Sequence, residues 1–209
     1  MTQTWLDFVE GKRVAVVGPA PSVGDQSADV DAHDVVIRVG YRCDLQPPAS
    51  GYGVKLDAVF WNYWNSRKLG LGLYDSFVYD IPWVLVKKEY RPPEGLQNFR
   101  VVPLPFKKAN QIPIVVGDLL ANNVRSVTVF GTDLYLGGPS FAYEPGYSGY
   151  IPERIWWEIK LHQPAQQHRF LRSAWERSRK IEGDARFLSA MRLSTREYIK
   201  QLTNEWEGK

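Results

Sequence analysis

The chain has 209 residues, of which 44% are hydrophobic and 13% aromatic, and its formal net charge is +3. This composition excludes a disordered chain, and the length suits one well-cored domain. The single Cys (Cys43) excludes an internal disulfide and a Cys-rich metal site, and three His residues do not suggest a zinc site, so we expect no metal. No long apolar run occurs between Met1 and Arg13, so we expect a cytoplasmic protein without a signal peptide or membrane anchor.

Five short Val-rich runs are typical of strands that are buried on both faces of a parallel sheet. They are Arg13–Gly18, Val35–Gly40, Leu56–Trp61, Trp83–Lys87 and Ser126–Gly131. Between the last two, Ile112–Val124 is the best candidate for a crossover helix, with Pro113 in its first turn. This series predicts an α/β fold with a Rossmann-like, mostly parallel sheet flanked by helices.

The last third of the chain is expected to be helical. Residues 137–150 are rich in Gly, Pro, Tyr and Ser, which is typical of a loop, and a long loop in a compact domain is often functional. The Ser194-x-x-Glu197 capping box predicts a last helix that runs through Trp206. An apolar helical face before it comprises Phe170, Leu171, Ala174, Trp175 and Ile181.

We therefore expect a single domain over residues 1–209. Its parts are a nucleotide-binding α/β core (1–136), an active-site loop (137–150) and a helical C-terminal part (151–209). Residues 1–150 carry 14 Lys and Arg against 15 Asp and Glu, whereas residues 151–209 carry 12 against 8. The basic last third could attract phosphate or an acidic acceptor, or it could simply be solvated helix faces.

A candidate ligand-binding turn, Gly18-Pro-Ala-Pro-Ser22-Val-Gly24, follows the first strand. Ligands of open parallel sheets bind beyond the carboxyl ends of strands, and small residues let the backbone approach a phosphate or sugar. The turn matches neither the dinucleotide fingerprint nor a phosphate loop. The alternative is an ordinary strand-to-helix turn.

Four segments together carry a longer pattern. They are residues 13–40 with Asp31, His33, Asp34 and Arg38; Gly53–Asp57 followed by Asn62; Ser126–Tyr135, which ends Gly-Thr-Asp-Leu-Tyr; and His162-Gln-Pro with Gln167 and the downstream Asp184. In this order they resemble the sialyl motifs of sialyltransferases (family 29 type, in small bacterial or viral members). The chain departs from that pattern at Pro19 and Gly40, where the family usually has Asn. It also lacks the Ser/Thr-x-Gly opening of the small sialyl motif, since Ala109–Ile112 occupies that region. Asn110 or Gln111 could supply the polar contact that this opening usually makes.

The resemblance implies a metal-independent, inverting glycosyltransferase without a cofactor. It would move a sialic acid-like sugar from a CMP-activated donor to a hydroxyl of a glycan or other acceptor. His162 is the expected general base, because a neutral imidazole is available at pH 7, and its alternative is a surface residue at a helix junction. Tyr135 is expected to donate to the leaving phosphate. His33 is expected to be structural, and His168 to be an ordinary helix residue.

The donor-binding candidates come from the ends of the first and fifth predicted strands and the turns after them, from within the second strand, from the residue after the third strand, and from the loop. They are Gly18, Ala20, Pro21, Ser22, Arg38, Asn62, Gly131, Thr132, Asp133, Tyr143 and Tyr147. Asp133 would accept from ribose or sugar hydroxyls, or else cap its own turn. Two alternatives remain: a transferase of the same fold that modifies a nucleic-acid base or uses another nucleotide sugar, and an inactive nucleotide-binding scaffold.

Overall fold

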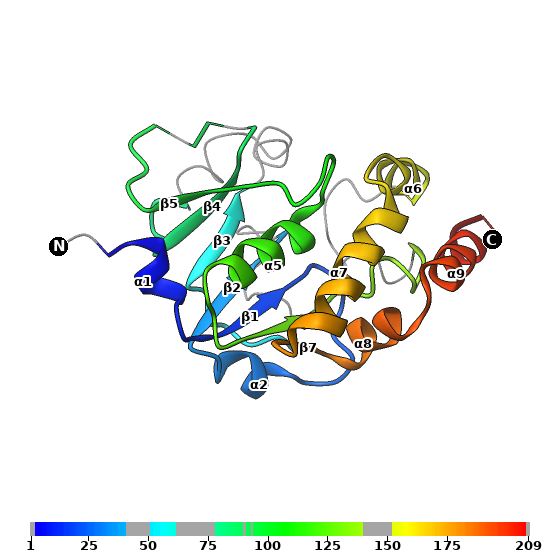
Figure 1. Cartoon of the computed structure of the whole chain (residues 1–209), viewed down its shortest axis with the longest axis horizontal. Coiled ribbons are helices and arrows are strands. Elements are labelled where there is room, and N and C mark those ends of the chain that lie inside the picture. Colours follow the sequence, from blue (N-terminus) through cyan, green and yellow to red (C-terminus); the bar gives the residue numbers. More distant parts are fainter. Residues whose placement is uncertain are drawn as a thin grey trace.

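A computed structural model of the chain describes residues 3–40, 51–61, 78–89, 91, 92, 94–139 and 152–207. Within these ranges the fold is built on one sheet of seven parallel strands in the order β5-β4-β3-β2-β1-β6-β7 (Figure 1). The strands are β1 (Arg13–Val17), β2 (Val35–Arg38), β3 (Ala58–Trp61), β4 (Trp83–Lys87), β5 (Phe99–Val102), β6 (Ser126–Phe130) and β7 (Ile181–Gly183). All five predicted strands are confirmed, and the sheet is α/β and Rossmann-like.

Helices cover both faces of the sheet. The helices are α1 (Trp5–Val9), α2 (Ser27–Asp31), α5 (Gln111–Ala121), α6 (Pro152–Leu161), α7 (Pro164–Ser178), α8 (Ala185–Arg192) and α9 (Thr195–Glu207). One large core joins the sheet to α1, α5, α7, α8 and α9, with α5 and α7 lying in front of the strands in Figure 1. On the other face α2 contributes Val30 to a smaller core with Tyr52 and Phe130. No helix in the described ranges is long and apolar enough to cross a membrane.

The sequence analysis did not predict two of the strands, β5 and β7. β5 lies at the sheet edge, where only Val102 of its four residues is buried, so it lacks the continuous apolar run of the central strands. β7 has three residues and pairs in parallel with β6, placing a strand inside the segment that was expected to be helical. The placement of Ile181 on a helical face is therefore wrong, because Ile181 begins β7 and α7 ends at Ser178.

The predicted helix signals are confirmed. Pro113 lies in the first turn of α5. At the start of α9, Glu197 accepts hydrogen bonds from the backbone and side chain of Ser194, and Ser194 Oγ accepts from the Glu197 backbone. These reciprocal bonds satisfy amide groups that the first turn of a helix leaves without partners.

The strand order identifies the place where such a sheet binds ligands. The chain adds β2, β3, β4 and β5 outward on one side of β1, and later adds β6 and β7 on the other side. The order thus reverses between β1 and β6, and ligands of open α/β sheets bind at the carboxyl ends of strands at such a switch point. Gly18–Ser22 follow β1 there, and Gly131–Asp133 follow β6.

Candidate functional site

The two turns at the switch point meet through their glycines. Gly18 N donates to Phe130 O at 2.8 Å, and Ala20 N donates to Gly131 O at 3.0 Å. A Cβ added at Gly18 would lie 2.4 Å from Gly131 O, and one added at Gly131 would lie 2.7 Å from Gly18 O. Close packing between the two turns therefore accounts for both glycines, independently of any phosphate.

The rest of the first turn packs against the segment that follows residue 50. Tyr52, which is fully buried, donates its hydroxyl to Pro21 O at 3.3 Å. A Cβ added at Gly51 would lie only 2.1 Å from Ser22 Oγ, so Ser22 leaves no room for a side chain there. The predicted donor-binding residues of this turn thus also shape the local backbone.

Asp133 holds a compact turn after β6. Its carboxylate accepts hydrogen bonds at 2.8 Å from the backbone N–H groups of Tyr135 and Gly137. Burial raises the pKa of Asp133, and these bonds, together with the Arg186 charge, oppose that rise. Turn capping therefore occupies both oxygens of Asp133, which was the alternative to a sugar-binding role.

The turn that Asp133 caps is strained. Leu134 and Tyr135 have φ values of +54° and +71°, a left-handed conformation that costs a residue with a side chain about 1–2 kcal/mol. Lys108 (φ +63°) and Gln163 (φ +55°) adopt the same conformation, and the side chain of Gln167 bonds the carbonyl of Lys108. Backbone strain of this kind concentrates at functional sites, where the surrounding structure enforces it.

Tyr135 and His162, the two predicted catalytic residues, line one pocket. Its other lining residues are Asn110, Leu134, Ile159, Pro164, Gln167 and Tyr198. The hollow has room for about one water molecule, so it suits a reacting group rather than a whole nucleotide sugar. Asn110 Nδ2 donates to the Tyr135 hydroxyl oxygen at 3.2 Å.

His162 follows α6 at its junction with α7, where its side chain is exposed. Its Nδ1 lies 3.4 Å from Lys108 O, a long contact in which only the nitrogen can donate. A hydrogen on Nδ1 leaves Nε2 as the basic nitrogen of the neutral ring. The buried Gln167 secures this junction, since its Nε2 donates to the carbonyls of Lys108 and His162 while its Oε1 accepts from Asn110 N.

Arg38 does not point toward this pocket. It ends β2 on the α2 face, is 3% exposed and donates to the carbonyls of Tyr52, Gly53 and Lys55. These bonds hold the segment that leads into β3. The described contacts of Arg38 are thus those of a structural residue, although the sequence indicated a donor-binding one.

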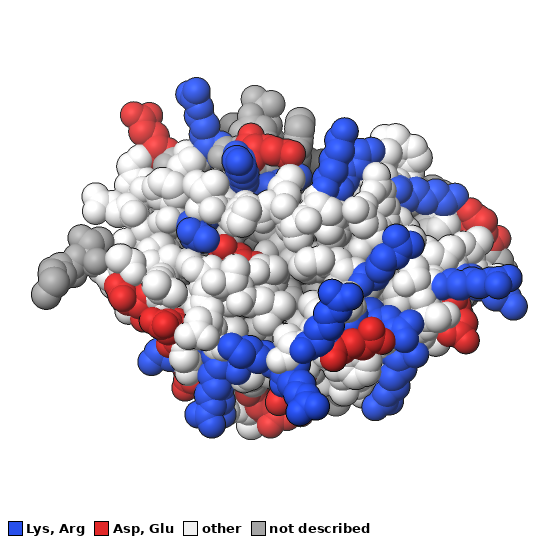
Figure 2. Space-filling model, in the orientation of Figure 1, with Lys and Arg blue, Asp and Glu red and all other residues white. Residues whose placement is uncertain are grey.

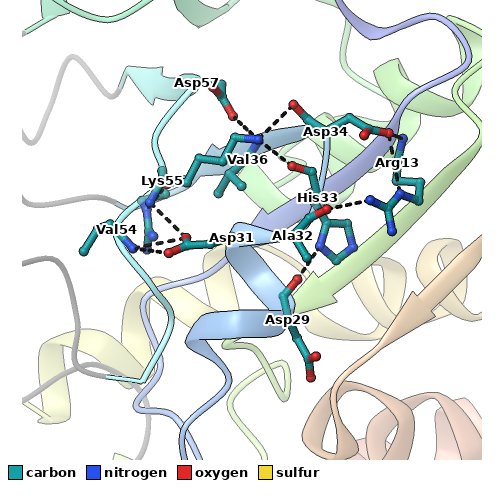
Figure 3. A network of polar contacts seen from close by, with 11 residues as sticks. Arg13, Asp29, Asp31, Ala32, His33, Asp34, Val36, Val54, Lys55 and Asp57 are labelled. Atoms are coloured by element: carbon teal, nitrogen blue, oxygen red, sulfur yellow. Dashed lines mark hydrogen bonds and ion pairs between the residues drawn. The ribbon is translucent and has the colours of Figure 1, made fainter.

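The Asp-x-His-Asp part of the first motif lies at the opposite, amino end of the strands (Figure 3). Asp31 accepts from the backbone N–H groups of Val54 and Lys55, and Lys55 Nζ donates to the carbonyls of His33 and Asp34. His33 Nδ1 donates to Asp29 O at 2.8 Å, a contact of the structural kind expected for this residue. This network joins the starts of β1, β2 and β3.

The chain contains one Asp-x-Asp run, Asp29-Val-Asp31, the pattern with which many sugar transferases hold a metal and a diphosphate. It lies in α2, and Asp31 is engaged by the backbone of residues 54 and 55. In the described ranges, no three His, Cys, Asp or Glu side chains are grouped as metal ligands would be. Metal independence is therefore an implication of the resemblance and does not follow from these observations.

Charge is spread over the face shown in Figure 2. Lys and Arg side chains lie along the upper and lower edges and across the lower right of this face, with acidic side chains among them. On α7, for example, Arg172 pairs with Glu176 at 2.9 Å. The described part of this face therefore offers no continuous basic groove of the kind that holds a nucleic acid.

Three predicted donor-binding residues, Asn62, Tyr143 and Tyr147, lie outside the described residues. The sequence analysis missed Tyr198 in the pocket wall and Trp206 behind it. Both belong, with Leu202, to the buried stripe of α9. Their spacing indicated an amphipathic helix but not which turn the helix contacts.

Comparison of the chain with models of protein families, with curated proteins and with solved structures finds no match.

Proposed function

We propose that the chain is a metal-independent, inverting glycosyltransferase that moves a sialic acid-like sugar from a CMP-activated donor to an acceptor hydroxyl. The observation that carries this proposal is the convergence of Tyr135 and His162 on one pocket, beyond the carboxyl ends of the strands. The motif resemblance supplies the donor class.

In this reaction His162 Nε2 takes the proton of the acceptor hydroxyl. The acceptor oxygen forms a bond to the anomeric carbon while the bond from that carbon to the CMP phosphate oxygen breaks, which inverts the centre. Negative charge grows on the leaving phosphate, and the Tyr135 hydroxyl donates to it. A positioned base contributes about 10²–10⁴-fold to such a step, and a preorganised donor about 10²–10³-fold.

A different nucleotide donor is the second candidate. The two positions where the family usually has Asn, Pro19 and Gly40, contact each other, since a Cβ at Gly40 would lie 3.2 Å from Pro19 Cγ. Both departures thus alter one spot next to the β1 turn. A change there favours altered nucleotide recognition with the same chemistry.

The first experiment measures thermal stabilisation by CMP, CDP, UDP, GDP, ADP and NAD at millimolar concentration. A ligand at about 100 times its dissociation constant stabilises the folded state by about 2.7 kcal/mol. Selective stabilisation by CMP supports the proposed donor, and stabilisation by UDP or GDP instead supports the second candidate. A protein that responds to none of them contradicts both.

The second experiment measures turnover of the donor that binds. His162→Ala should retain donor binding and lose turnover by at least about 10²-fold. His33→Ala is the matched control, because His33 lies at the amino end of the strands and contacts Asp29 O and Thr128 Oγ1. Equal loss of turnover in both variants contradicts the role of His162.

A further inference from the structure

Two consecutive carbonyl groups of the strained turn are held by α9. Tyr198 donates its hydroxyl to Leu134 O, and Trp206 donates its indole N–H to Tyr135 O, each at 2.9 Å. Leu134 and Tyr135 are the two left-handed residues of that turn. Together with the Asp133 bonds to the N–H groups, these contacts fix the backbone that aims the Tyr135 side chain.

Trp206 also contacts the helix that leads to His162. Its ring stacks on Trp156 of α6 with centroids 5.6 Å apart and planes 11° apart. The neighbouring Glu207 accepts from Trp156 Nε1 at 3.3 Å and from Lys160 Nζ at 2.6 Å. α6 ends at Leu161, so these contacts set the position from which His162 projects.

Tyr198 ties the turn to α7 as well. Its ring stacks on His168 with centroids 4.4 Å apart and planes 9° apart. His168, expected to be an ordinary helix residue, is instead fully buried and bonded to Thr195 Oγ1 and Ala190 O. The Tyr198 hydroxyl therefore has little freedom to leave Leu134 O.

We propose that Trp206 and Tyr198 are positioning residues, through which α9 holds the Tyr135 turn and the His162 junction in register. This inference rests on the proposed function for its catalytic meaning, but the positioning itself is a property of the folded chain. Neither residue reacts: Trp206 acts through Tyr135 and α6, and Tyr198 acts through Leu134.

The test uses Trp206→Phe and Tyr198→Phe, which remove one hydrogen-bond donor each and retain an aromatic ring. Trp5→Phe and Tyr79→Phe are matched controls, since Trp5 Nε1 donates to Asp118 and the Tyr79 hydroxyl donates to Glu94 O, with no contact to the turn. His162 is observed by ¹³C-histidine NMR, in which three His residues give a simple spectrum. Tyr135 is observed by ¹⁹F NMR of 3-fluorotyrosine protein, and Tyr135→Phe and His162→Ala assign the signals.

We expect Trp206→Phe to shift both the Tyr135 and the His162 resonances, Tyr198→Phe to shift that of Tyr135, and the controls to shift neither. Loss of one buried hydrogen bond lowers the equilibrium constant for the positioned turn about tenfold, so kcat should fall by up to about tenfold with KM unchanged. Unchanged resonances in both α9 variants, or equal shifts in the controls, overturn the proposal. If the wild-type chain turns over no donor, the proposed function fails while the NMR comparison still decides the positioning. If Trp206→Phe does not fold, the Tyr135 resonance of Tyr198→Phe, a variant that lacks a single oxygen, decides whether α9 positions the turn.

Discussion

The ring of Pro19 lies against the position that a Cβ on Gly40 would occupy, and the φ of Gly40 is +62°. A Cβ at Gly40 would lie 3.2 Å from Pro19 Cγ and 3.3 Å from Pro19 Cβ. The contact joins the turn after β1 to the end of the β2 segment. A side chain at residue 40 therefore has to adopt a left-handed backbone and displace the proline.

Gly40→Ala should lower the free energy of unfolding by about 1–2 kcal/mol for the left-handed backbone, with a further loss from the proline contact. Gly95→Ala is the control, since Gly95 has φ +81° and a Cβ added there would meet no atom within 4 Å. In a double-mutant cycle measured by urea unfolding, Pro19→Ala should relieve part of the Gly40→Ala cost by about 0.5 kcal/mol or more. Strict additivity would contradict the contact.

Gly18→Ala tests whether the glycine at the switch point serves packing. The added Cβ would meet the backbone oxygen of Gly131 at 2.4 Å, and a backbone atom cannot swing away as a side chain can. We expect a loss of at least about 2 kcal/mol in the free energy of unfolding without any ligand. Gly117→Ala is the control, because its Cβ would meet side-chain atoms rather than backbone, the ring tip of Phe170 at 3.3 Å and Pro105 at 3.6 Å, and alanine favours the helix. Wild-type stability in Gly18→Ala with weaker CMP binding would instead favour a ligand-approach role.

Asp31→Ala should destabilise the fold and leave donor affinity unchanged. Removing the carboxylate leaves the N–H groups of Val54 and Lys55 without their acceptor, and because Val54 is exposed to water the cost should be about 0.5–1.5 kcal/mol. Asp29→Ala, on the same helix with an exposed side chain, should change stability by no more than about 0.5 kcal/mol. Urea unfolding and CMP titration measure both quantities. Loss of CMP affinity in a folded Asp31→Ala variant would contradict this prediction and indicate that Asp31 contributes to donor binding.

The sequence was sufficient for the central strands, because short Val-rich runs such as those of β1 and β2 favour strands that are buried on both faces of a sheet. It was also sufficient to name Tyr135 and His162 together. The sequence placed Arg38 and Asp31 in their motif, but it did not predict which face or end of the sheet their side chains lie on. Which face or end of the sheet a side chain serves depends on strand order and on contacts with distant segments, such as residues 52–55.

Tyr198 in the pocket wall is another residue whose position the sequence did not predict. Tyr198 lies 63 residues after Tyr135 in the chain, and only the packing of α9 brings it to Leu134 O. An apolar stripe predicts that a helix buries one face. The partner of that face, and the donation of a buried hydroxyl to one strained carbonyl, depend on tertiary structure.

His168 should make stability depend on pH. The carbonyl of Ala190 can only accept, so Nε2 carries the hydrogen and Nδ1 accepts from the Thr195 hydroxyl in the neutral ring. Burial lowers the pKa of His168 and the Arg172 charge adds to this, while the Ala190 bond and Glu176 oppose it. The pKa of a His in an unfolded chain is about 6.5, so below that pH the unfolded chain binds more protons than the native one.

The contribution of His168 is therefore present above about pH 6.5 and is lost as pH falls below it, with a slope of at most about 1.4 kcal/mol per pH unit. Burial raises the pKa of Asp133 and Asp184, which favours the native state on acidification and has the opposite sign. Comparing variants cancels that effect: between pH 8 and 5, urea unfolding should show a shallower loss for His168→Gln than for wild type. Parallel curves for wild type and His168→Gln would mean that the buried ring is not the group that resists protonation.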